Sequence, residues 1–151
     1  MGFVCQGRYA LAPIEPTDAE KYVNLQLDCM EQTYDPIYFD TLGESFTARH
    51  RTERNEYLED FHRHLSSPTV RGFFAYEVPG WTPDGGLSCS IGARINWDKP
   101  VGLALSLCEP SSWELERADN LPELPAGTRK LAHLYTLNHT HGTGLGQALY
   151  E

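Results

Sequence analysis

The residues of this chain best suited to chemistry are three glycines at alternate positions, Gly142, Gly144 and Gly146. They follow an apolar run, residues 131–137, and precede a run of good helix formers. Closely spaced glycines let the backbone turn tightly and approach a ligand with no Cβ in the way. The first turn of the following helix adds unpaired N–H donors and the positive end of its dipole. The spacing predicts a buried strand, a glycine loop and a helix start, which together can bind a phosphate group.

Two common phosphate-binding motifs do not fit this loop. A P-loop needs Gly-Lys-Ser/Thr, and no lysine follows Lys130. A dinucleotide-binding loop needs a third glycine at position 147, where the chain has Gln147, and an acidic residue well downstream. A glycine-rich connection that binds no ligand stays open as the alternative.

The segment LYTLNHTHGTGLGQAL resembles the signature of the GNAT superfamily of acyl-CoA-dependent N-acetyltransferases. In that family a strand ending in Leu-Tyr-Val is followed by a loop of the form Arg/Gln-x-x-Gly-x-Gly/Ala and a helix. Residues 134–136 correspond to the strand end and residues 141–146 to the loop, so the resemblance covers about twenty residues closely. The chain departs from the pattern at His141, where the family has Arg or Gln, and at Asn138, where a Pro is usual.

The resemblance implies that the chain binds acetyl-CoA as acyl donor. Backbone N–H groups of the loop would hold the diphosphate, and the strand end would pair with the pantetheine arm. A backbone N–H near Thr136 or Leu137 would meet the charge that grows on the thioester oxygen. The residues implied in donor binding are Leu134, Tyr135, Thr136, Leu137, His141, Gly142, Thr143, Gly144, Leu145, Gly146 and Gln147.

Acetyl transfer to an amine also needs a base. A free alkyl amine has a pKa of about 10.4 and is almost wholly protonated at pH 7. His133, on one face of the predicted strand, is the first candidate, with Glu77 and Glu109 behind it. For His133 the alternative is a half-buried, merely hydrogen-bonded side chain. No metal site is predicted, because His62 and His64 point to different sides of a helix.

Composition narrows the class of protein. The 151 residues suit a single domain, 1–151, and the net charge of −9 with only 12 Lys and Arg makes nucleic acid a poor partner. No apolar run reaches the roughly 18 residues of a membrane span, and the N-terminus lacks the features of a secretion signal. The cysteines, far apart in sequence, are expected to be reduced thiols, which favours a cytoplasmic protein: Cys5, Cys29, Cys89 and Cys108.

Hydrophobic patterning predicts an α+β fold. The resemblance implies a mixed, mostly antiparallel sheet flanked by helices in three layers, as in the N-terminal part of a GNAT domain. A helix is expected from Glu15 to its stop at Asp35-Pro36, a loop or short helical turn over 36–43, and a second helix over 44–65. The strands expected are 8–14, 70–78, 87–97, 101–108 and 131–137, and residues 109–128 are expected to form an exposed acidic loop.

The sequence leads to three candidate functions. The first is an N-acetyltransferase that transfers acetyl directly to a small-molecule or peptide amine. The second is a non-catalytic acyl-CoA-binding or regulatory module, and the third a half-domain that works only by completing an oligomer. The third follows from an expectation that the chain stops before the C-terminal part of the domain, which would leave an open strand edge and favour a homodimer.

Overall fold

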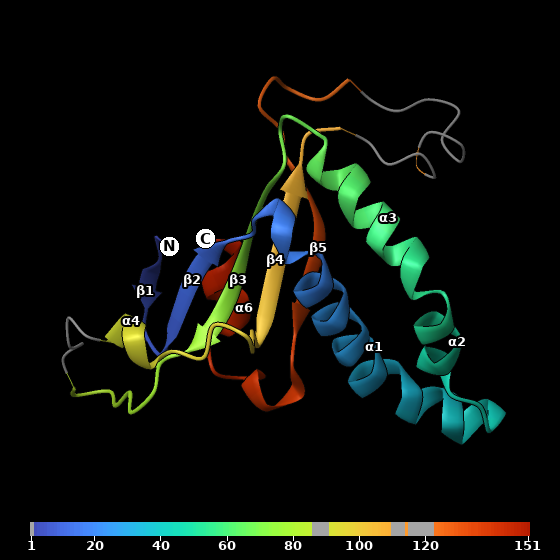
Figure 1. Ribbon diagram of the computed structural model, residues 1–151, viewed down its shortest axis with the longest axis horizontal. Coiled ribbons are helices and arrows are strands. Elements are labelled where there is room, and N and C mark those ends of the chain that lie inside the picture. Colours follow the sequence, from blue (N-terminus) through green and yellow to red (C-terminus); the bar gives the residue numbers. More distant parts are fainter. Residues whose placement is uncertain (1, 86–90, 110–113, 115–122) are drawn as a thin grey trace.

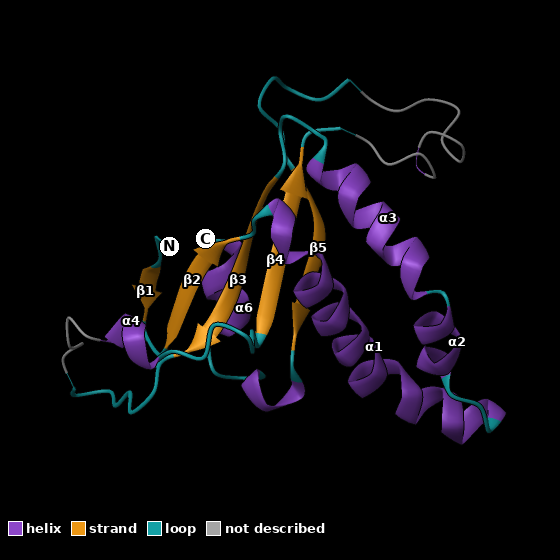
Figure 2. Cartoon of the chain, in the orientation of Figure 1, coloured by secondary structure: helices purple, strands orange, loops and turns teal. Residues whose placement is uncertain are grey.

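The computed structural model describes residues 2–85, 91–109, 114 and 123–151 of the chain. Its centre is a five-stranded sheet in the order β1-β2-β3-β4-β5, and every neighbouring pair runs antiparallel (Figure 1). The strands are β1 Val4–Gln6, β2 Tyr9–Pro13, β3 Arg71–Glu77, β4 Gly102–Leu107 and β5 Lys130–Thr136. Helices and strands together confirm the predicted α+β class (Figure 2).

Helices cover both faces of this sheet. The α-helices are α1 Ala19–Leu42, α2 Phe46–Thr52, α3 Arg54–Leu65, α4 Ile91–Arg94 and α6 Leu145–Tyr150, and two 3-10 helices are η1 Pro16–Asp18 and η2 Asn138–Thr140. In Figure 1, α1 lies in front of the sheet beside β5, and α6 lies behind it. The two faces therefore bury separate apolar clusters.

Alternation along the strands assigns each side chain to one cluster. On the α1 face Phe74, Tyr76 and Leu103 pack with Tyr22 and Phe61 of the helices. The cluster on the other face brings residues of β2, β3 and β4 against α6: Tyr9, Leu11, Ala75, Val101, Ala104, Leu145 and Leu149. Because both faces of the sheet are covered, side chains on both faces of β4 are apolar, and its sequence is a continuous apolar run.

The predicted end of the first helix at Asp35-Pro36 is wrong. Helix α1 runs through Pro36 to Leu42 and ends at Gly43, whose φ is 67° and whose N–H donates to Phe39 O at 3.1 Å. Proline removes one helical hydrogen bond, but contacts with α2 hold the helix on both sides of it. The second predicted helix is also two helices, α2 and α3, because the backbone at Glu53 leaves the helical conformation (φ −94°, ψ 19°).

The first predicted strand, 8–14, is confirmed as β2, and the next strand prediction along the chain after 70–78 needs correction. Strand β1 was not predicted; it pairs with β2 across a turn at Gly7, where φ is 60°. The predicted strand 87–97 is contradicted where it is described, because α4 occupies part of it. Ile95 there is buried in the core, and the Trp97 ring centre lies 5.1 Å from that of Phe3 and 4.8 Å from that of Tyr76, so tertiary contacts override the β pattern. Residues 86–90 lie outside the described residues.

Strand β5 was predicted to be buried, and it is not. Within the described residues it pairs with β4 on one side only, and both Leu131 and Leu134 are more than 40% exposed. Its register shifts at a bulge between Leu105 and Ser106 of β4. The predicted exposed acidic loop 109–128 lies mostly outside the described residues. Of its described positions, 123–128 are exposed, whereas Glu109 and Glu114 are half-buried.

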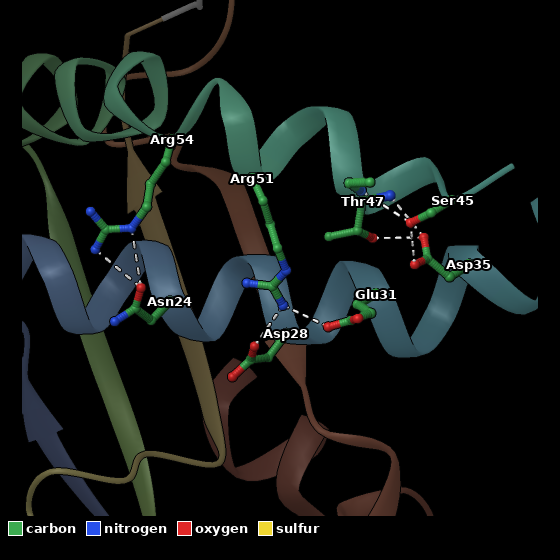
Figure 3. A network of polar contacts seen from close by, with 9 residues as sticks. Asn24, Asp28, Glu31, Asp35, Ser45, Thr47, Arg51 and Arg54 are labelled. Carbon is green, nitrogen blue, oxygen red and sulfur yellow. Dashed lines mark hydrogen bonds and ion pairs between the residues drawn. The ribbon is translucent and has the colours of Figure 1, made fainter.

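Polar contacts fasten α2 and α3 onto α1 (Figure 3). The Asp35 carboxylate of α1 accepts from Thr47 N and Thr47 Oγ1, both at 2.8 Å, and from Ser45 Oγ at 2.7 Å. Burial alone would raise the pKa of Asp35, but these hydrogen bonds and the nearby Arg51 outweigh it and hold the pKa below its usual range. Asp35 therefore caps α2 from a neighbouring helix.

Replacing Asp35 with Ala is expected to lower the free energy of unfolding by about 1 to 3 kcal/mol, because it leaves the buried Thr47 N–H and hydroxyl without an acceptor. Urea denaturation measures this change. Asp40→Ala, on an exposed position of the same helix, is the matched control and should change the stability by less than about 0.5 kcal/mol. Equal losses in both variants would contradict the cap.

Candidate functional site

The glycine loop joins β5 to α6 through η2. Gly142 and Gly144 have φ values of 75° and 88°, in the left-handed region where other residues are strained. Two turns shape the loop: His141 N donates to Asn138 O at 3.1 Å, and Thr143 N donates to Thr140 O at 3.3 Å. The strand, loop and helix predicted from the spacing are present.

Several loop amides remain open to a ligand. The N–H groups of the three glycines and of Leu145 and Gln147 have no acceptor within the described part of the chain. All these residues except Leu145 are exposed. A Cβ built on Gly142, Gly144 or Gly146 would meet no described atom within 4 Å, so no side chain crowds these three positions. The loop can thus offer several N–H donors to one anionic group.

Helix α1 holds the start of this loop. Pro36 has no N–H to donate to Gln32 O, and that carbonyl instead faces Asn138 Nδ2 at 3.5 Å. The Gln32 side chain accepts the Asn138 backbone N–H at 2.8 Å. On the other side of the loop, Tyr9 OH and Thr143 Oγ1 are 2.6 Å apart. Because α1 continues through Pro36, the carbonyl of Gln32 has no helical N–H partner and is available to the loop residue Asn138.

The outer edge of β5 presents backbone groups next to the loop. Leu137 N donates to Val101 O at 2.9 Å, so its N–H faces inward. Alternation along an antiparallel strand then turns the N–H and C=O groups of Leu134 and Thr136 outward. Of the two amides predicted for the thioester oxygen, Leu137 is occupied within the sheet and Thr136 is open.

A cavity of about 230 Å³ lies between α1 and this edge. Helix α1 contributes one wall and β5 the other, with His141 at the end nearest the loop; the lining is Cys29, Met30, Thr33, Tyr34, Leu134, Tyr135, Thr136 and His141. Burial raises the pKa of the Cys29 thiol to about 12, so Cys29 stays protonated at neutral pH. Burial also raises the pKa of Tyr135, although a hydrogen bond from Gln26 opposes it. This groove has no carboxylate, lysine or arginine among its described lining residues, and His141 connects it to the loop.

His133 does not line this groove. Its Nδ1 is hydrogen-bonded to Tyr22 OH, and its ring lies 5.5 Å from that of His64 between centroids. Burial lowers the pKa of His133 to about 4, and the nearby His64 adds to the effect. A neutral, hydrogen-bonded imidazole of this kind fits the structural alternative better than a base near pH 7.

The two predicted carboxylates are also apart from the groove and from each other. Glu77, at the end of β3, accepts from His139 Nε2 at 2.9 Å. Glu109 accepts from Ser67 Oγ at 2.7 Å and from the Thr69 hydroxyl, and these hydrogen bonds lower its pKa. The structure thus brings together the predicted donor-binding residues but not the predicted bases.

Sequence reasoning missed the α1 side of the site. Gln32 and Tyr34 lie on a helix far from the loop in sequence, and Tyr9 lies on β2. A signal was present in Pro36, because a proline inside an otherwise helical pattern marks a carbonyl that needs another partner. Which partner it finds depends on the tertiary fold.

Nowhere in the described ranges do three His, Cys, Asp or Glu side chains gather as metal ligands. None of the described helices combines the length and apolar character needed to cross a lipid bilayer. No family model matches the chain, and no curated protein matches it. Assignment of a function therefore depends on the geometry of the loop, the β5 edge and the groove.

Proposed function

We propose that this chain binds acetyl-CoA and transfers its acetyl group to a primary amine. The observation that carries the proposal is the row of open loop amides, from Gly142 to Gln147, placed directly beside the open edge of β5. A diphosphate at the loop would leave the rest of an extended ligand free to follow the edge strand. Its reactive end would then enter the groove beside α1.

The arrangement of elements is consistent with the GNAT resemblance. Strand β2 is followed by helix α1, after the short strand β1, and the described residues place two strands, β3 and β4, between the helices and the signature strand β5. The resemblance implies that number of strands. It also implies that the donor's arm lies against the edge of the signature strand, and that edge is open in the described residues.

Chain residues can be assigned roles in this reaction. The outward N–H of Thr136 would donate to the thioester oxygen as negative charge develops there. The amine has to lose a proton before or during attack, and His141 is the imidazole that borders the groove. Tyr34 and Tyr135 exclude water from the same space. These assignments move the base from His133 to His141.

Calorimetric titration with acetyl-CoA, followed by a thiol-release assay on a panel of amines, tests the proposal. Binding with amine-dependent thiol release supports acetyl transfer. Binding without release with any amine favours the non-catalytic module. Absence of binding, together with a concentration-dependent oligomer in ultracentrifugation, would overturn the proposal and favour the half-domain that completes an oligomer through the β5 edge.

Replacing Thr136 with Pro is expected to weaken acetyl-CoA binding about tenfold, the equivalent of one lost hydrogen bond. Proline removes an outward N–H with which no described strand pairs, so the sheet should survive. Thr136→Val, which keeps the N–H, is the control and should bind like the original chain. Equal affinity of both variants in calorimetry would remove the β5 edge from the site.

The cellular setting proposed with this function is the cytoplasm. Cys5, Cys29 and Cys108 are free thiols, which fits a reducing compartment, while Cys89 lies outside the described residues. The acceptor proposed is a small-molecule or peptide amine. Neither nucleic acid nor a membrane is proposed as a partner.

A further inference from the structure

A larger cavity, of about 820 Å³, lies at the end of the sheet where β3 ends and β4 begins. Its volume is within the range of about 300 to 1,000 Å³ typical of small-molecule sites. Its basic lining comes from Arg8, Arg94 and Lys99, and its flat apolar walls include Pro79, Trp81 and Pro100. None of the residues proposed for the acetyl groove beside α1 lines it.

The charge of this cavity contrasts with the rest of the chain, whose net charge is −9. Most described basic side chains have a carboxylate partner, as Arg51 has in Asp28 and Glu31. Arg8, Arg94 and Lys99 have none within ion-pairing distance among the residues described. Three cations without carboxylate partners around one concave surface concentrate positive potential there.

Side-chain packing directs two of these cations into the cavity. The Arg8 guanidinium carbon lies 5.9 Å from the centre of the Trp81 ring, in a cation–π contact. A Cβ built on Gly80 would lie 3.8 Å from an Arg94 guanidinium nitrogen, so Arg94 folds over the turn at Gly80. Glu77, the one carboxylate among the described lining residues, already accepts from His139.

Arg8 and Trp81 also border a second, smaller cavity of about 260 Å³. That cavity is lined by the loop residues Thr143, Gly144 and Gln147, so the same pair of side chains separates the glycine loop from the basic cavity. A ligand with phosphate groups at the loop could extend across Arg8 and Trp81 into the basic cavity.

We propose that the basic cavity binds a phosphorylated nucleotide, with the phosphate held by Arg94 and Lys99 and the base against Trp81 and Arg8. Arginine and lysine bind phosphate oxygens through charge-assisted hydrogen bonds, and aromatic and guanidinium planes stack on a planar base. Two sources carry this chemistry: a free nucleotide, or the 3′-phosphorylated adenosine of coenzyme A. This proposal does not require acetyl transfer, because a free nucleotide could occupy the site in a chain that transfers no acetyl group.

Calorimetric titration of the full chain with adenosine 3′,5′-bisphosphate tests this site, with adenosine and inorganic phosphate as partial probes. The bisphosphate should bind more tightly than either. The double variant Arg94→Gln, Lys99→Gln should weaken it at least about tenfold, since two charge-assisted contacts are lost. Trp81→Ala should weaken both the bisphosphate and adenosine.

The matched control is the double variant Arg71→Gln, Arg129→Gln, which removes the same charge at the opposite end of β3 and should change the affinity by no more than about twofold. Absence of bisphosphate binding to the original chain, or equal weakening in both double variants, would overturn the proposal. Thermal unfolding verifies that every variant is folded.

Titration with coenzyme A distinguishes the two sources. Weaker coenzyme A binding in the Arg94→Gln, Lys99→Gln variant, with dephospho-coenzyme A unaffected, identifies the cofactor's adenosine as the ligand. Bisphosphate binding that is lost in this variant, while coenzyme A binding is unchanged, identifies a free nucleotide. A chain that binds the bisphosphate but not acetyl-CoA would refute acetyl transfer and keep this site.

Discussion

Gly144→Val is expected to weaken acetyl-CoA binding by at least about a hundredfold while leaving the sheet folded. Gly144 has a φ of 88°, and the Cβ of a β-branched residue makes this conformation costly. A Cβ there meets no protein atom within 4 Å, so the cost arises from the backbone and not from a clash. The loop would relax to a negative φ, and its N–H groups would no longer converge on one point.

Gly127→Val provides a matched control for this prediction. Gly127 has a φ of 84°, also with no protein atom near its Cβ position, but it lies in an exposed turn before β5. Both variants strain a left-handed glycine to the same degree, so their thermal stabilities should fall similarly. Calorimetry should find weakened binding only for Gly144→Val. Unchanged affinity in that variant would exclude the glycine loop as the diphosphate site.

The free energy of unfolding is expected to fall as the pH is lowered from about 6.5 to about 4, because of His133. In the folded chain burial lowers its pKa to about 4, whereas an unfolded His has a pKa of about 6.5. Above the unfolded pKa both states are neutral and the full stability is present. Between the two values only the unfolded state binds the proton, so stability declines by up to about 3 kcal/mol and levels off below the folded pKa.

Urea denaturation across this pH range measures the effect, and His133→Phe should remove most of it. Tyr22 OH loses its partner in that variant, so its stability at neutral pH should be lower while its dependence on pH is shallower. His62→Gln, at an exposed position of α3, should keep the original dependence. An unchanged slope in His133→Phe would show that another group causes the decline.

How far the sequence determines the site is clearest at the loop. Alternate glycines after an apolar run were enough to predict a strand, a turn with left-handed residues and a helix start, because these preferences are local to the backbone. The same residues could not reveal the groove beside α1. Its walls come from segments about one hundred residues apart in the sequence.

The errors have a common cause. Pro36 and the segment around Trp97 carry local signals for a helix end and a strand, and both signals were overridden by contacts with distant residues. His133 was chosen as a base from its place on a strand face, but its partner Tyr22 lies on α1. The basic cavity is likewise lined by residues far apart in the sequence: Arg8 precedes α1, and Arg94 follows α3.

The sequence by itself determined the α+β class, the strand β3 and the loop between β5 and α6. Each of these depends on periodicity or on glycine, which act over a few neighbouring residues. Only the tertiary structure decided that the outer edge of β5 is open among the described residues, that Asn138 attaches to α1 and that His133 is half-buried, with a lowered pKa. Burial and strand pairing depend on contacts between segments that are far apart in the sequence, and a local sequence pattern does not contain that information.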